Sequence, residues 1–479
     1  MRPVAEWLSP ILVKELRQGV RGNVFTASFL LLQGLMVLAL GLTLVDPSNS
    51  RMVGFFWTML ALPVLVVLPL SGAQALSAEA SQKTLEPMLL TRLSPRGIVF
   101  GKWASLAAQN LILVSSIAPY VLLRYFLGDV DVAQDAWMLL DFVVTAGVAT
   151  SITVAVSALS VAPVFRLALA VPLLVLAFLA QPLFLMRTSS FGGPTLAGSA
   201  LLAPAVAIGL AALTVVVMIE GGAWQIAPAA DRTSAAARAL VLAALPLVGL
   251  ASRGMGSQSL HIPASLWVGA LATLVAMGSL CEPMAEIPAV YARRFQRGPW
   301  RRVAGWVFAP GWASGVLFTA IASVTACLAL QKVEKALARP DVIAAVVAAL
   351  YLPVPLRQAL PWRRVPLAGY YLVVQALSWV LGALAPMGDG LESPRLKAAG
   401  AWLLPLSPIL KVMIEEDKPA LTSDLVDRFA QVLWASVIGI TLVLAVRALR
   451  RAEALGRSGA CGTPPGAAEV PADPAASAA

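Results

Sequence analysis

Residues 24–45 read VFTASFLLLQGLMVLALGLTLV, a run without a charged side chain. A helix of this length is about 33 Å long, which is enough to cross the roughly 30 Å hydrocarbon core of a bilayer. The run lacks a small-residue cleavage site, so we expect a retained span rather than a secretory signal. Similar runs recur along the chain, and backbone polar groups in lipid must be paired within the chain. The sequence therefore predicts an all-α, polytopic integral membrane protein.

The overall composition supports this fold class. Of the 479 residues, 59% are apolar and 13% are charged, and the mean hydropathy is +0.82. Soluble domains carry about 25% charged residues. A chain this apolar cannot cover itself with a water-compatible surface, which excludes a soluble enzyme. The net charge of +10 is explained by topology rather than by nucleic-acid binding, because the basic residues lie between the apolar runs.

The apolar runs predict about twelve transmembrane helices. Their approximate ranges are 24–45, 53–75, 103–127, 137–160, 165–186, 199–219, 239–252, 265–281, 305–330, 342–356, 367–386 and 429–447. If the N-terminus is cytoplasmic, the cytoplasmic segments hold 23 of the 35 Lys and Arg residues and the outer segments hold 12. Positive charge accumulates on the cytoplasmic side, so we expect both termini to be cytoplasmic.

Two short segments are predicted to lie at the membrane surface. Residues 8–22 (LSPILVKELRQGVRG) place apolar residues four apart, which predicts an amphipathic helix on the cytoplasmic leaflet within residues 1–23. Residues 401–413 (AWLLPLSPILKVM) are apolar but too short and too rich in proline to span, which indicates a re-entrant or interfacial element on the outer side. The polar face of the first helix supplies the candidate interfacial residues Lys14, Glu15, Arg17 and Arg21.

Residues 79–102 (EASQKTLEPMLLTRLSPRGIVFGK) form the most informative stretch between two spans. Glu79–Leu90 is expected to form a short helix, and Ser94 with Pro95 is expected to cap and start a second one. Lys102 is expected to snorkel toward the headgroups. The result is a helical hairpin on the cytoplasmic side, although an ordinary solvated loop fits the same composition.

The stretch resembles a signature of the membrane subunits of type-two ABC exporters, E-x-x-x-G-T-L-E-x-L-L-x-x-P-L-S-x-x-x-I-x-x-G-K. The matching residues are Glu79, Thr84, Leu85, Glu86, Leu89, Leu93, Ser94, Ile98, Gly101 and Lys102. The N-terminal SPILVKEL is similar to the N-P-I-x-x-K-E-L of that family's surface helix. The resemblance covers about the first 220 residues and departs from the signature at Lys83, where the family has glycine, and at Arg92, where it has proline.

The resemblance implies a permease subunit that forms the substrate path of an exporter in the bacterial inner membrane. A separate ATPase subunit would use the ATP, and the permease would form a homodimer or a heterodimer with another permease. The ATPase-coupling residues implied by position are Glu79, Thr84, Leu85, Glu86, Leu89, Leu93 and Ser94.

The resemblance also divides the chain. Residues 24–220 would be a six-span permease-like half with the coupling hairpin 79–102, and residues 239–451 a second membrane half of inserted spans or a fused second permease. Residues 456–479 are small residues with Pro and Gly and are expected to be disordered.

No catalytic, cofactor or metal site is expected. The nearest approach to a P-loop, Arg96–Trp103, lacks the first glycine and the Ser or Thr that binds magnesium. With His261 as the single histidine and no CxxC spacing among the three cysteines, no His or Cys metal cluster is indicated. A secondary transporter driven by an ion gradient, or a membrane anchor or assembly protein that transports nothing, stays open as an alternative.

Overall fold

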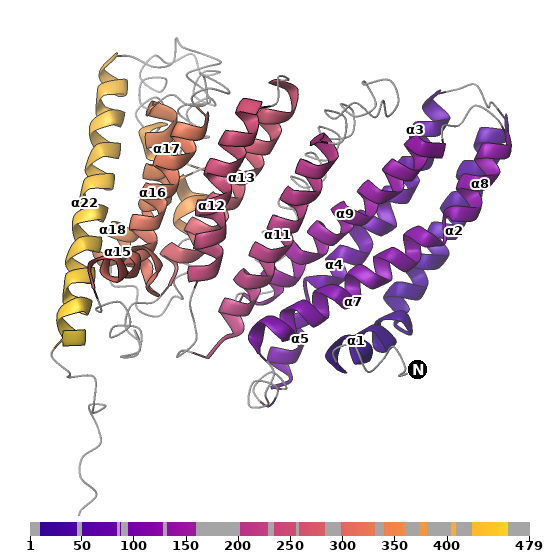
Figure 1. The fold of residues 1–479 in the computed structure, drawn as a ribbon, viewed down its shortest axis with the longest axis horizontal. Coiled ribbons are helices and arrows are strands. Elements are labelled where there is room, and N and C mark those ends of the chain that lie inside the picture. Colours follow the sequence, from indigo (N-terminus) through magenta and orange to yellow (C-terminus); the bar gives the residue numbers. More distant parts are fainter. Residues whose placement is uncertain are drawn as a thin grey trace, which may run out of the picture. The chain divides into compact units, whose positions relative to one another are not determined.

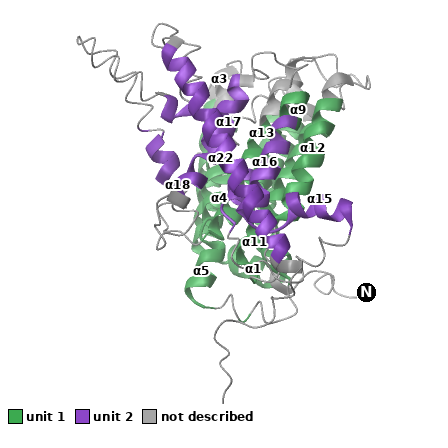
Figure 2. Ribbon diagram, turned by 90° about the vertical axis from the view of Figure 1, so that its left-hand side faces the viewer, with its two compact units in different colours: residues 1–275, 325–338 green, residues 276–324, 339–479 purple. Residues whose placement is uncertain are grey.

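The structure is a computed structural model in which every described regular element is a helix. The described residues are 10–45, 50–83, 87, 94–127, 132–159, 202–228, 234–254, 258–282, 298–330, 340–359, 373–378, 380, 404–408 and 424–457. They belong to two compact units, which are coloured separately in Figure 2 and are described one at a time below. Unit 1 holds residues 1–275 and 325–338, and unit 2 holds residues 276–324 and 339–479.

Within the described residues, six helical stretches are long and apolar enough to cross a membrane, and a bent pair of helices makes a seventh if it counts as one span. The six are Asn23–Leu42, Phe56–Ser81, Pro95–Phe126, Asp135–Ser157, Ala205–Ile226 and Leu425–Ala454, and the bent pair is Pro299–Phe308 with Trp312–Leu328. The described residues are helical, as expected, and hold several helices suited to a membrane, whereas the count of about twelve spans and the cytoplasmic termini stay predictions. The predicted span 165–186 lies outside the described residues.

Unit 1 contains the N-terminal helices. Their bounds are α1 Pro10–Val20, α2 Asn23–Val45, α3 Ser50–Ala61, η2 Leu62–Val67, α4 Leu68–Gly72, α5 Ala75–Ser81, α7 Pro95–Ser115, α8 Ala118–Leu127, α9 Val132–Ser157, α11 Leu202–Ile226, α12 Ala235–Gly254 and α13 Gln258–Leu280, whose last residues belong to unit 2. Helices α7, α9 and α11 pack side by side, and α1 lies against α7 (Figure 1).

Proline interrupts two of the predicted spans. Residues 53–75 form α3, a π-helical stretch and α4 rather than one regular helix, because Pro63 and Pro69 cannot donate a backbone hydrogen bond. The third span breaks at Ser116 and Ile117, two residues before Pro119. The start of that span is as expected: Ser94 is the N-cap of α7, its Oγ accepts from the Gly97 N–H at 3.1 Å, and Pro95 is the first helical residue.

Small residues let the unit 1 helices approach closely. A Cβ added to Gly72 of α4 would lie 2.6 Å from Thr153 Oγ1 of α9, and one added to Gly222 of α11 would lie 3.4 Å from the Ala155 Cα. Close approach through small residues is the usual way helices pack where lipid removes the hydrophobic driving force.

Unit 2 contains the C-terminal helices. Their bounds are α15 Pro299–Phe308, α16 Trp312–Leu330, whose last residues belong to unit 1, α17 Pro340–Tyr351, α18 Pro353–Ala359, η4 Leu404–Leu406 and α22 Asp424–Arg457. Helix α22 packs against α17, and the Trp434 Nε1 donates to the Pro405 carbonyl at 3.0 Å. This bond joins α22 to the described part of the predicted re-entrant segment 401–413.

Two boundaries in unit 2 differ from the sequence prediction. The predicted span 305–330 is bent by 96° between α15 and α16, with Gly311 at φ +124° in the bend. The Gly311 N–H donates to Glu282 Oε2 at 2.9 Å, which fixes the bend. The last span is longer than 429–447, and its helix includes Gly456 and Arg457 of the predicted tail. Charged residues at a span end extend a helix into water, where the hydropathy pattern does not reveal it.

Candidate functional site

Lys102 of α7 lies between two carboxylates from two other helices. Its Nζ is 3.2 Å from Glu15 Oε1 of α1 and 2.8 Å from Glu79 Oε1 of α5. The Lys102 side chain is 5% exposed, so it does not snorkel as the sequence predicted. Two carboxylates hold the ammonium inside, because a buried cation is stable only when it is paired. We call Glu15, Glu79 and Lys102 the ion-pair joint.

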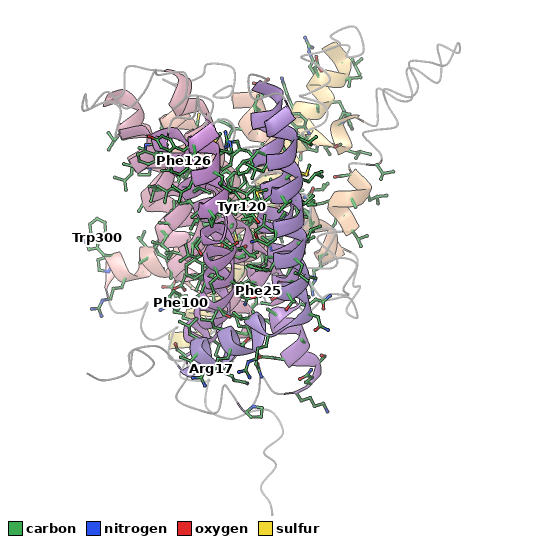
Figure 3. The ribbon with its side chains drawn as sticks, turned by 90° about the vertical axis from the view of Figure 1, so that its right-hand side faces the viewer. Arg17, Phe25, Phe100, Tyr120, Phe126 and Trp300 are labelled. Atoms are coloured by element: carbon green, nitrogen blue, oxygen red, sulfur yellow. The ribbon has the colours of Figure 1, made fainter. Side chains whose placement is uncertain are left out.

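Helix α1 reaches the joint along one face. Glu15 is half-buried, whereas Lys14, Arg17 and Arg21 are exposed. In Figure 3, Arg17 lies at the opposite end of unit 1 from Phe126. One turn beyond Glu15, Gly19 lies so close to α7 that an added Cβ would overlap the buried carboxamide of Gln109. Helix α1 is therefore held against α7 by an ion pair and by a glycine contact.

Helix α5 reaches the joint from the other side and is anchored to α9. The Leu76 N–H donates to Ser157 Oγ at 3.2 Å, and the Leu76 side chain is buried with Ile98, Val154 and Ile226. Glu79 follows Leu76 by three residues and therefore lies on nearly the same helical face. The apolar contact fixes the carboxylate that pairs with Lys102.

The chain turns sharply after α5. The predicted helix Glu79–Leu90 ends at Ser81 instead, and Lys83 adopts φ +56° while its N–H donates to the Ala80 carbonyl at 3.2 Å. A left-handed residue with this hydrogen bond is a common helix C-terminal cap, and glycine adopts it at the lowest energy. This backbone conformation is a physical reason for glycine at the matching place in the family signature.

The start of α7 is tied to α11 by a third ion pair. Arg96 Nε lies 2.8 Å from Glu220 Oε1, with the Arg96 side chain 60% exposed. Unlike the ion-pair joint, this contact is open to water and is therefore screened.

A polar stripe continues from Lys102 along α7. Ser105, Gln109 and Asn110 are all buried. Gln109 Nε2 donates to Ser105 Oγ at 3.4 Å, whereas neither amide atom of Asn110 has a hydrogen-bond partner among the described residues. A buried polar group without a partner is rare in a folded protein and points to a role beyond packing.

The candidate coupling residues are only partly described. Glu79 and Ser94 are described, and Thr84, Leu85, Glu86, Leu89 and Leu93 lie outside the described residues. The joint contains one member of each predicted set, Glu79 from the coupling residues and Glu15 from the interfacial helix. Ser94 caps α7 and lies outside the joint. The sequence prediction missed Lys102 as the common partner, although one basic and two acidic residues next to apolar spans were a usable signal.

A second buried ion pair, separate from the ion-pair joint, links α8 to the first turn of α9. Arg124 Nη1 is 3.3 Å from Asp135 Oδ2, with both side chains under 10% exposed. The guanidinium stands 4.7 Å from the centre of the Phe56 ring and 5.8 Å from that of Trp57, which favours a cation–π contact. Arg124 is therefore buried and paired rather than exposed at the membrane interface. Asp141, a further acidic residue of α9, is half-buried.

Next to this pair, a hydrogen-bonded network joins α2 to the break between α7 and α8. Gln33 Nε2 donates to Ser116 Oγ at 2.9 Å, and the Tyr120 hydroxyl donates to Gln33 Oε1 at 2.7 Å. Figure 3 shows Tyr120 well above Arg17 along unit 1. Two hydrogen bonds to Gln33 therefore hold α2 at the break between α7 and α8.

No group of His, Cys, Asp and Glu that could hold a metal ion occurs among the described residues. Comparison of the chain with protein-family models, curated proteins and solved structures gave no match.

Proposed function

We propose that this chain is the transmembrane permease subunit of an ATP-driven ABC exporter of the type-two class. It would form the substrate path, with about twelve spans and both termini in the cytoplasm of a bacterial cell. A separate ATPase would bind the hairpin 79–102 and supply the energy. A second permease, identical or not, would complete the transporter in the inner membrane.

The ion-pair joint is the observation that carries this proposal. The resemblance assigns contact with the ATPase to the region that begins at Glu79, and it assigns a surface position to α1. Lys102 joins both to α7, a long helix suited to cross the membrane. A push on α5 would therefore reach α1 and α7 together, because a buried ion pair resists separation.

The polar stripe of α7 supports a substrate path beside the joint. Asn110 lies eight residues beyond Lys102, about 12 Å along the helix. Its buried carboxamide can both donate and accept a hydrogen bond to a polar substrate group. Asn110→Leu is expected to lower transport without lowering thermal stability, since the replaced amide has no hydrogen-bond partner to lose in the described part of the chain.

The first test of the proposal is co-purification. The tagged chain, isolated from membranes of its own organism, should bring down an ATPase with Walker motifs. The double variant Glu86→Ala/Leu89→Ala in the hairpin should weaken that binding. Absence of an ATPase, together with transport that survives ATP depletion and collapses with uncouplers, would favour a secondary transporter. A chain that transports nothing under either energy source would favour the anchor.

The second test separates coupling from binding. Lys102→Met should leave the ATPase bound but abolish ATP-driven transport, because a movement of α5 would then no longer be passed on to α7. Arg96→Gln is the matched control, since it removes an ion pair from the same helix without touching α1 or α5. Equal transport defects in the two variants would contradict the assigned role of the joint.

A further inference from the structure

Helix α15 is bent by 96° away from α16. If α16 crosses a bilayer along its normal, α15 must run nearly parallel to the membrane plane. Its sequence, PWRRVAGWVF, combines two tryptophans, two arginines and no acid. Short helices of this composition lie in the headgroup layer, where tryptophan is favoured at the boundary between water and hydrocarbon.

The first turn of α15 projects from unit 2. Trp300 is 86% exposed and Val303 is 61% exposed, whereas Gly305 and Val307 in the second half of the helix are buried. Figure 3 shows the Trp300 side chain directed away from its own ribbon. Arg301 is exposed on the same turn. An apolar ring and a cation are thus presented together outside the packed part of the unit.

A second basic element joins this turn. Arg302 Nε lies 2.7 Å from Glu453 Oε1, which attaches α15 to the last turns of α22. Arg450 precedes Glu453 by three residues, so it shares that face of the helix, and it is exposed. Arg302 is paired with Glu453, and no ion pair among the described residues involves Arg301 or Arg450, so these two arginines add exposed positive charge to this part of unit 2.

We propose that α15 and the end of α22 bind the headgroup of an anionic phospholipid. Arg301 and Arg450 would pair with its phosphate oxygens, and Trp300 would lie beside the glycerol and the upper acyl chains. Nucleic acid fits this surface less well, because an α15 that runs parallel to the membrane plane would hold Trp300 at the boundary between water and hydrocarbon. The site does not depend on any ATPase partner.

The test measures lipid retention by the full chain in mild detergent, with native mass spectrometry as the readout. Phosphatidylglycerol and phosphatidylcholine are titrated as the two probes. One arginine near an anionic surface contributes about fivefold in affinity. The double variant Arg301→Gln/Arg450→Gln is therefore expected to lose about 25-fold in phosphatidylglycerol retention and to keep its phosphatidylcholine retention.

Arg428→Gln is the matched control. Arg428 is an exposed arginine of the same helix, 22 residues before Arg450 and so about 33 Å from it. It should leave lipid retention unchanged, and Arg301→Lys/Arg450→Lys should preserve most of the retention because the charge is kept. Each variant must elute as a single species with unchanged thermal unfolding. If the double Gln variant does not fold, the lipid preference of the double Lys variant is compared with that of the unchanged chain instead.

Three results would overturn the site. These are equal retention of both lipids by the unchanged chain, an equal loss in the Arg428→Gln control, and displacement of phosphatidylglycerol by a short oligonucleotide at physiological salt. The last result would show a nucleic-acid surface instead.

Discussion

Helices α1 and α15 are both short, and each directly precedes a long apolar helix, α2 and α16 respectively. Their charged residues make opposite kinds of contact. In α1, Glu15 is half-buried against Lys102, and Gly19 is pressed against Gln109. In α15, the first turn is exposed and its one described ion pair, between Arg302 and Glu453, is half open to water. The first helix is a fixed part of its unit, and the second presents a free surface.

A single acidic residue accounts for much of this difference. Helix α1 carries Glu15 among its basic residues, whereas α15 carries no acid. A carboxylate on the inner face can pair with a buried lysine of the next layer, which holds the helix against the protein. A helix with only arginine and tryptophan lacks that link, and its stable environment is the headgroup layer. An amphipathic pattern alone therefore does not distinguish a helix that packs against the protein, such as α1, from one that binds lipid, as proposed for α15.

Lys102→Met should have the largest effect on this contrast. It leaves two carboxylates facing each other without their cation, and breaking a buried pair costs about 3–5 kcal/mol. Glu15 and Glu79 keep some exposure, so the lower end of that range is expected. Thermal unfolding in detergent measures it. The triple variant with Glu15→Gln and Glu79→Gln should recover part of the loss, and a Lys102→Met chain as stable as the parent would refute the joint.

Gly19→Leu should come next. The new side chain would collide with the buried Gln109, and overpacking of this kind costs about 1–3 kcal/mol. Gly34→Leu on α2 is the matched control, since Gly34 is exposed with no atom within 4 Å of an added Cβ. The control should be neutral or slightly stabilising because leucine favours helix over glycine. Equal losses in both variants would show that α1 is not held closely against α7.

Gly311→Ala tests the bend that sets α15 apart. Gly311 has φ +124°, where a side chain costs about 1–3 kcal/mol. The expected loss of stability should be accompanied by weaker phosphatidylglycerol retention, since the direction of α15 depends on this residue. Gly269→Ala, in open space on α13, should be neutral or slightly stabilising because alanine favours helix over glycine, and it should leave phosphatidylglycerol retention unchanged. Unchanged stability in Gly311→Ala would mean that the bend is not constrained at this residue.

Arg302→Gln should have the smallest effect. The Arg302 side chain is 52% exposed, and exposed ion pairs contribute about 0–1 kcal/mol and weaken in salt. Thermal unfolding at low and high salt, with a double-mutant cycle to Glu453→Gln, measures the coupling. A loss as large as that of Lys102→Met would show that α15 is locked to its unit as α1 is, and the contrast between them would fail.

The local features were readable from the sequence because they depend on neighbours in the chain. Apolar runs identified the helices, and Ser94 with Pro95 identified the start of α7, since a capping hydroxyl and an N-terminal proline act within one turn. The left-handed turn at Lys83 was missed because lysine is not a usual residue there. Likewise, the bend at Gly311 did not interrupt the apolar pattern of residues 305–330.

The sequence by itself determined that this chain is a bundle of membrane helices, and it placed the charges that carry information between them. Only the tertiary structure decided which charges meet. Glu15 and Lys102 are 87 residues apart, and no local pattern pairs them. The same holds for Arg302 and Glu453, which are 151 residues apart. Secondary structure follows from interactions within a few residues, whereas an ion pair depends on how whole helices pack, and that packing separates the anchored helix α1 from the exposed turn of α15.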